Sequence, residues 1–176
     1  MKKLYKTTVN LFAVMMLLII SSVSYAQTVS EKGAKIKHID YKIPAIKTKY
    51  GEITQKIRNT ISSKGEVWVY SIGSMGSDGV FSSEFSIEEL NGIISELESL
   101  KKEELKDIAI NPDNLDNSYI SPNGFIVAYS VYSGASQWRI VIDSSDYRSR
   151  KYIEDINLVL DALINGREKL KELSLK

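Results

Sequence analysis

The fold of this chain is best read from the stretch Glu66–Leu100, EVWVYSIGSMGSDGVFSSEFSIEELNGIISELESL. Its first apolar run, VWVYSI, has no polar face, which predicts a strand covered on both sides. The glycine-rich connector Gly73–Gly79 then leads to a second strand, Val80–Phe85. A helix follows, because Ser86 and Glu89 form a capping-box pattern ahead of apolar residues at helical spacing. The stretch therefore predicts a hairpin followed by a helix.

A similar order recurs further along the chain. Phe125–Tyr132 is again apolar on both faces, Gln137–Asp143 alternates apolar and polar residues, and a long amphipathic helix is expected over Asp146–Leu173. Tyr70 and Tyr129 begin similar tripeptides in the two stretches. This likeness leaves two interpretations open: a duplicated strand-strand-helix unit, or two units that share only the general pattern of a hairpin and a helix.

The remaining segments complete the expected fold. Ile36–Ile43 alternates as a half-buried strand that ends at Pro44, and isoleucines at three- and four-residue steps predict a helix over Ile46–Ile61. Asp107–Gly124 is rich in turn-forming residues and is expected to be a long loop around a short extended piece. The prediction is an α+β fold: an antiparallel sheet of four to five strands with about three helices packed mainly on one face.

The first residues of the chain have the features of an export signal. Lys2, Lys3 and Lys6 precede the apolar run Leu11–Ile20, and a small-x-small pattern ends at Ala26. Ten apolar residues are too few to span a bilayer as a helix. We therefore expect a signal peptide over 1–26, a flexible leader over 27–35 and a single α+β domain over 36–176. The expected location is the periplasm or the extracellular space, with no membrane span left after cleavage.

Composition excludes several kinds of chemistry. There is no cysteine and only one histidine, so a thiol enzyme, a cysteine-bound metal and a histidine-rich metal site are all ruled out. The 23 basic and 22 acidic residues nearly cancel, so no overall charge favours nucleic acid. No cofactor, metal site or catalytic residue is predicted.

Four weak motifs have simpler structural explanations. The glycines of Gly73–Gly79 lack the Lys-Ser/Thr ending of a phosphate loop and fit a hairpin better. Ser99 and Lys102 match Ser-x-x-Lys at the wrong end of a helix. His38 and Asp40 could form an acid–base pair but also fit the solvent-exposed face of a strand. The acids around Asp113 and Asp116 lack the spacing of a calcium loop and are typical of turns.

The function expected from these patterns is non-enzymatic binding. If the helices cover one face of the sheet, the other face carries aromatic and polar side chains that can dock a protein, a glycan or a small ligand. The candidate binding residues are Tyr70, Ser130, Tyr132 and Arg139. The alternative is an exported hydrolase that uses carboxylates or a serine not located by any motif.

Overall fold

The computed structural model describes residues 35–76 and 79–176. The predicted signal peptide, and the predicted leader apart from Lys35, lie outside the described residues. The elements, in chain order, are β1 (Lys37–Thr48), β2 (Gly51–Ser62), β3 (Gly65–Gly76), β4 (Gly79–Phe85), α2 (Ile87–Ile110), β5 (Leu115–Ile120), β6 (Ile126–Tyr132), β7 (Ala135–Val141), the short 3-10 helix η2 (Tyr147–Ser149), β8 (Arg150–Ile153) and α3 (Ile156–Ser174).

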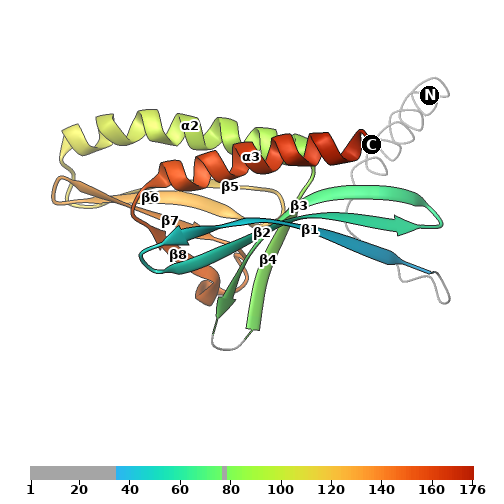
Figure 1. Cartoon of the computed structure of the whole chain (residues 1–176). Coiled ribbons are helices and arrows are strands. Elements are labelled where there is room, and N and C mark those ends of the chain that lie inside the picture. Colours follow the sequence, from blue (N-terminus) through green and yellow to red (C-terminus); the bar gives the residue numbers. More distant parts are fainter. Residues whose placement is uncertain (1–34, 77–78) are drawn as a thin grey trace, which may run out of the picture. The chain divides into compact units, whose positions relative to one another are not determined.

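The fold is α+β, as predicted, but it is built from two sheets. Strands β1–β2–β3–β4 form one antiparallel sheet and β5–β6–β7–β8 form a second, each in chain order. Each sheet is followed by one long helix, and both helices lie along the same side of the molecule (Figure 1). The prediction of a single sheet of four to five strands and of three helices was therefore wrong in detail.

The predicted helix over Ile46–Ile61 is instead most of a β-hairpin. Ile53, Gln55, Ile57 and Asn59 are buried on one face of β2, and the residues between them are exposed or half-buried. The four-residue step from Ile53 to Ile57 is even, so it fits one face of a strand as well as one face of a helix. The β-branched side chains and the turn at Gly51, which has φ +121°, decide in favour of the strand.

Three further boundaries differ from the sequence prediction. Residues 115–120 of the expected loop form β5, and α2 continues ten residues beyond Leu100 to Ile110. The expected start of the last helix is occupied by η2 and β8, so α3 begins at Ile156. Each half is therefore a four-stranded sheet plus a helix. Tyr70 lies on the third strand of its sheet and Tyr129 on the second, so their tripeptides do not mark equivalent positions.

The lysine- and glutamate-rich end of α2 is bound to the second sheet. Glu104 accepts a hydrogen bond at 2.7 Å from the Trp138 indole, and Asp107 accepts one at 2.5 Å from the Tyr129 hydroxyl. Burial, together with the Asp107 carboxylate, raises the pKa of Tyr129. These bonds attach the last turns of α2 to the second sheet, and the helix ends at its left-handed C-cap, Asn111.

The two helices are exchanged between the halves. α2 follows the first sheet but packs on β5, β6 and β7, whereas α3 follows the second sheet and packs on β1, β2 and β3. The halves also meet directly: the rings of Phe85 and Phe125 pack edge to face with centroids 5.2 Å apart, and the Asn123 amide donates to the Glu84 carbonyl at 2.8 Å. A single cluster of buried apolar side chains runs through both halves.

Within the part of the chain that the structure describes, no helix is long and apolar enough to cross a membrane.

Candidate functional site

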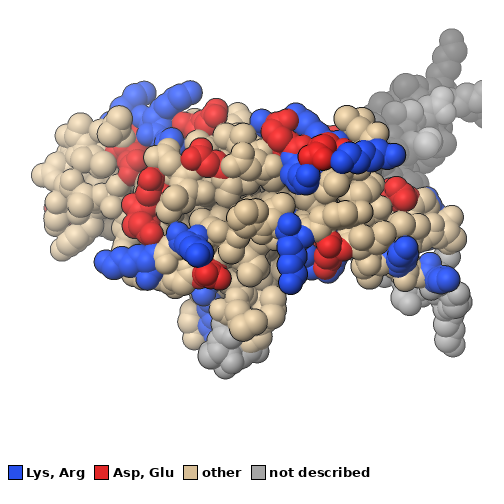
Figure 2. Space-filling view, in the orientation of Figure 1, with Lys and Arg blue, Asp and Glu red and all other residues tan. Residues whose placement is uncertain are grey.

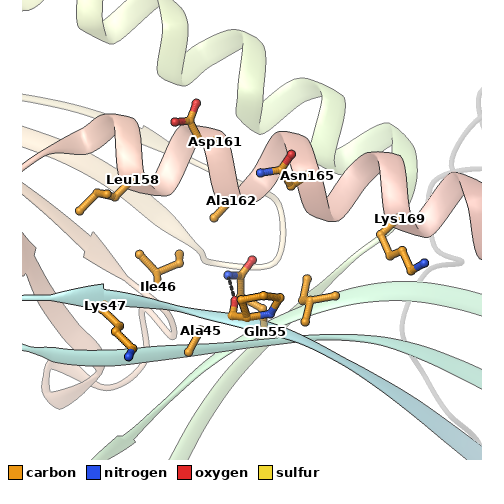
Figure 3. A pocket seen from close by; sticks show the side chains of 11 residues that line it. Ala45, Ile46, Lys47, Gln55, Leu158, Asp161, Ala162, Asn165 and Lys169 are labelled. Atoms are coloured by element: carbon orange, nitrogen blue, oxygen red, sulfur yellow. Dashed lines mark hydrogen bonds between the residues drawn. The ribbon is translucent and has the colours of Figure 1, made fainter.

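A groove lies between α3 and the strand β1, with a volume of about 660 Å³. Its walls are apolar: Ile43, Pro44 and Ile46 come from β1, and Leu158 and Ala162 come from α3. Figure 3 shows Ile46 pointing toward the helix and Leu158 and Ala162 pointing back toward the strands. We call this cavity the α3–β1 groove. Its volume and apolar lining are typical of a small-molecule site.

An irregularity in β1 shapes one wall of the groove. Ile43 pairs with Gln55 and Ile46 pairs with Ile53, so β1 contains one extra residue between the two pairs. Pro44 lies in this bulge, where its missing N–H costs little because β1 is at the edge of its sheet. The strand is therefore bent beside the groove, which a regular ladder would not allow.

The buried amide of Gln55 holds the bulge in place. Its nitrogen donates to the Pro44 carbonyl at 2.6 Å, and its oxygen accepts a bond from the Tyr70 hydroxyl at 2.6 Å. Gln55 is only 8% exposed, so both ends of its amide need partners and both have one. The wall of the groove is thus fixed to the core by a chain of two hydrogen bonds.

The groove exists because α3 lies closest to an inner strand of the first sheet. A Cβ on Gly166 would lie 2.3 Å from the ring of Tyr70, so helix and strand β3 are in direct contact there. On the second sheet, Gly92 of α2 faces Tyr119 of the edge strand β5. Helix α2 thus covers β5, the edge strand of the second sheet, whereas α3 leaves β1, the edge strand of the first sheet, partly uncovered.

The ends of the groove carry polar side chains. Asn165 and Lys169 of α3 lie at one end, and the Lys169 ammonium forms an ion pair with Glu172 at 2.7 Å on the helix surface. Figure 2 shows a mostly uncharged surface between α3 and the strands, with charged side chains on either side of it. The adjoining hairpin, residues 35–64, has eight basic and two acidic residues, so the groove lies beside a positively charged segment.

Two of the predicted binding residues lie in a hydrogen-bonded network on the second sheet. On the face turned away from the helices, Ser130 donates to Asp116 and accepts from Arg139, and the Arg139 guanidinium lies 3.2 Å from Asp116. The bond from Ser130 and the charge of Arg139 lower the pKa of Asp116. The polar groups of this network are therefore bonded to one another.

Tyr132 and Tyr70 occupy very different surroundings. Tyr132 extends from the end of β6 on the same face as Ser130 and is 68% exposed. Tyr70 lies on the first sheet, on the face turned toward the helices, and is fully buried beneath α3. Burial raises its pKa. The structure therefore brings Ser130, Arg139 and Tyr132 onto one face and places Tyr70 elsewhere.

The groove was not found from the sequence, although one signal for it was present. Apolar and polar residues alternate both before and after Pro44. A proline inside such an alternating segment is typical of an edge strand with a bulge. The contribution of α3 could not be predicted, because its groove-lining residues lie more than a hundred positions further along the chain.

The His38 and Asp40 side chains have separate structural partners. His38 is bonded to Thr60, whereas Asp40 binds Lys56 and Arg58, so the two do not form an acid–base pair. In residues 35–76 and 79–176 no group of three or more potential metal ligands comes together. Hydrogen bonds from hydroxyl or cationic side chains lower the pKa values of five carboxyl groups, those of Asp40, Asp116, Asp146, Glu168 and Glu172.

Comparisons with protein-family models, with curated proteins and with solved structures each found no match to this chain.

Proposed function

We propose that this chain is an exported protein that binds an anionic amphiphile in the α3–β1 groove and performs no catalysis. The observation that carries the proposal is the groove itself, an apolar channel of about 660 Å³ held open by the bulge at Pro44. The leader supports export. Of the three kinds of partner expected from the sequence, a protein, a glycan or a small ligand, the groove favours the small ligand.

The apolar part of such a ligand would lie between the two walls. Leu158, although 38% exposed, lines the groove together with Ile46 of the opposite wall. An alkyl chain placed between these side chains would be removed from water, with a gain of about 25 cal/mol for each Å² of apolar surface buried. This contact supplies affinity but little selectivity.

The charged end of the ligand would lie near Asn165 and Lys169. The pair between Lys169 and Glu172 is exposed, and exposed pairs contribute about 0–1 kcal/mol, so a ligand carboxylate or phosphate can compete for the ammonium. The basic hairpin beside the groove adds a favourable field for an anion. Asp161, also at the rim, points away from the strands in Figure 3.

Binding of dodecanoate, followed by isothermal titration calorimetry, tests the proposal. Saturable binding is expected, and Leu158→Asp should weaken it at least tenfold, because a charge then replaces an apolar wall. The matched control is Leu105→Asp on α2, where Leu105 is 72% exposed and outside the groove. Thermal unfolding should show both variants folded.

Two results would contradict the proposal. One is the absence of dodecanoate binding by the unaltered protein. The other is an equal loss of binding in Leu158→Asp and Leu105→Asp. A loss in Tyr132→Ala, with Leu158→Asp unaffected, would instead place the binding surface on the face of the second sheet predicted from the sequence.

A further inference from the structure

A second cavity, of about 470 Å³, lies on the face of the first sheet that is turned away from the helices. We call it the open-face hollow. Its lining comes from all four strands β1–β4 and includes no residue of α2 or α3. It opens on the other face of the sheet from the α3–β1 groove, and the two cavities share the lining residues Ile43, Ala45 and Gln55.

The floor of the open-face hollow is bare backbone at Gly73. A Cβ on this residue would lie 2.9 Å from the Phe81 carbonyl oxygen and 3.2 Å from the Thr54 hydroxyl, so only glycine fits. Glycine inside a strand weakens the strand and is typical of places where another group comes close to the backbone. Here the Phe81 carbonyl of β4 and the Thr54 hydroxyl of β2 lie close to the Gly73 backbone, which forms part of the lining of the hollow.

A serine hydroxyl without a partner among the described residues faces this floor. Ser71 lies two residues before Gly73 on the same face of β3 and is only 3% exposed. It lines the hollow, and among the described residues its side chain makes no hydrogen bond. The Ser71 hydroxyl oxygen keeps access to the hollow, so it can donate a hydrogen bond to a ligand atom placed there.

The walls of the open-face hollow carry more positive than negative charge. Lys42, Lys56 and Arg58 line it together with Asp40 and Glu84. Asp40 is bound by Lys56 and Arg58, each at 2.7 Å, and Arg58 also reaches Glu84 at 3.0 Å. Lys42 forms no ion pair with any described residue. One ammonium group is thus left to neutralise an incoming anion.

We propose that the open-face hollow binds a sugar phosphate. The phosphate would accept hydrogen bonds from Lys42 and Ser71, two of the lining donors that have no partner among the described residues, while the sugar hydroxyls would donate to the carboxylates of Asp40 and Glu84. A bare phosphate could use only the first set of groups. The inference does not depend on the proposed function of the groove.

Titration with glucose 6-phosphate, glucose and inorganic phosphate, followed by NMR amide shifts, tests this inference. Glucose 6-phosphate should bind most tightly and shift the amides around Gly73. Lys42→Ala and Ser71→Ala should each weaken its binding about tenfold or more, the usual effect of losing a charge-assisted hydrogen bond. Lys37→Ala removes an equal charge from the same strand but outside the hollow, and should change the affinity less than twofold.

The outcomes separate this site from the groove and from nonspecific charge. Leu158→Asp should leave glucose 6-phosphate binding intact even if dodecanoate binding fails. Equal losses in Lys42→Ala and Lys37→Ala would show that only the overall charge of the hairpin matters and would overturn the inference. Absence of any shift at millimolar glucose 6-phosphate, with the protein folded, would overturn it as well.

Discussion

Two glycines show how single residues determine the contacts of the helices. At Gly166 the backbone of α3 touches the ring of Tyr70, whose hydroxyl is bonded to Gln55 and whose position is therefore fixed. At Gly92 of α2 the nearest atom to an added Cβ, the Tyr119 hydroxyl oxygen, would be 3.9 Å away. Glycine is thus required at position 166 of α3, where a side chain has no room, whereas position 92 of α2 has room for one.

The substitution of each glycine by alanine should have opposite effects. Gly92→Ala should stabilise the fold by up to about 1 kcal/mol, because alanine is the better helix former. Gly166→Ala gains the same propensity but forces a methyl group into the Tyr70 ring, and overpacking of this kind costs about 1–3 kcal/mol. Since the contact is very short, we expect net destabilisation. Urea unfolding of both variants checks this, and a change of the same sign in both would contradict it.

At the scale of the element, the start of α2 was predicted correctly from its local sequence. The Glu89 amide donates to the Ser86 hydroxyl at 3.2 Å, and the Glu89 carboxylate accepts the Ser86 amide at 2.7 Å, which confirms the capping box. The far end of α2 was missed, although it carries a local stop signal: Asn111 caps the helix in the left-handed conformation and Pro112 follows it. Local signals therefore mark both ends of this helix, and tertiary contacts with Trp138 and Tyr129 attach its last turns to the second sheet.

Removal of the cap should destabilise the fold measurably. Ser86→Ala leaves the Glu89 amide without its acceptor and should cost about 1 kcal/mol, a shift of roughly 2–4 °C in the midpoint of thermal unfolding. Ser86→Asp retains an acceptor at the positive end of the helix and should keep the midpoint nearly unchanged. An unchanged midpoint in Ser86→Ala would mean that the cap does not contribute to stability.

At the scale of the whole molecule, the exchange of helices makes the halves depend on each other. The first sheet is covered by α3, which follows the second sheet in sequence. The second sheet is covered by α2, which follows the first sheet. Neither half encloses its own core. The exchange also creates the α3–β1 groove, since the two walls come from the first and the last elements that the structure describes.

The export proposal makes a prediction for the whole chain. Cleavage after Ala26 would leave a mature protein that begins at Gln27, because Ser24 and Ala26 fit the small positions read by signal peptidase. Intact-mass measurement of protein recovered from the envelope or the medium checks this. An Ala26→Lys variant should retain the leader. Recovery of the unaltered chain with residues 1–26 still attached would contradict the proposal.

The sequence by itself determined the α+β class, the start of α2 and the strands β3, β4, β6 and β7, because periodicity and capping act within about ten residues. Only the tertiary structure decided that Ile46–Ile61 is strand, since its isoleucine spacing fits both elements and burial makes the choice. The same is true of the separate sheets, the exchanged helices and the groove. Each depends on contacts between residues far apart in sequence, and side-chain alternation carries no information about which distant element covers a given face.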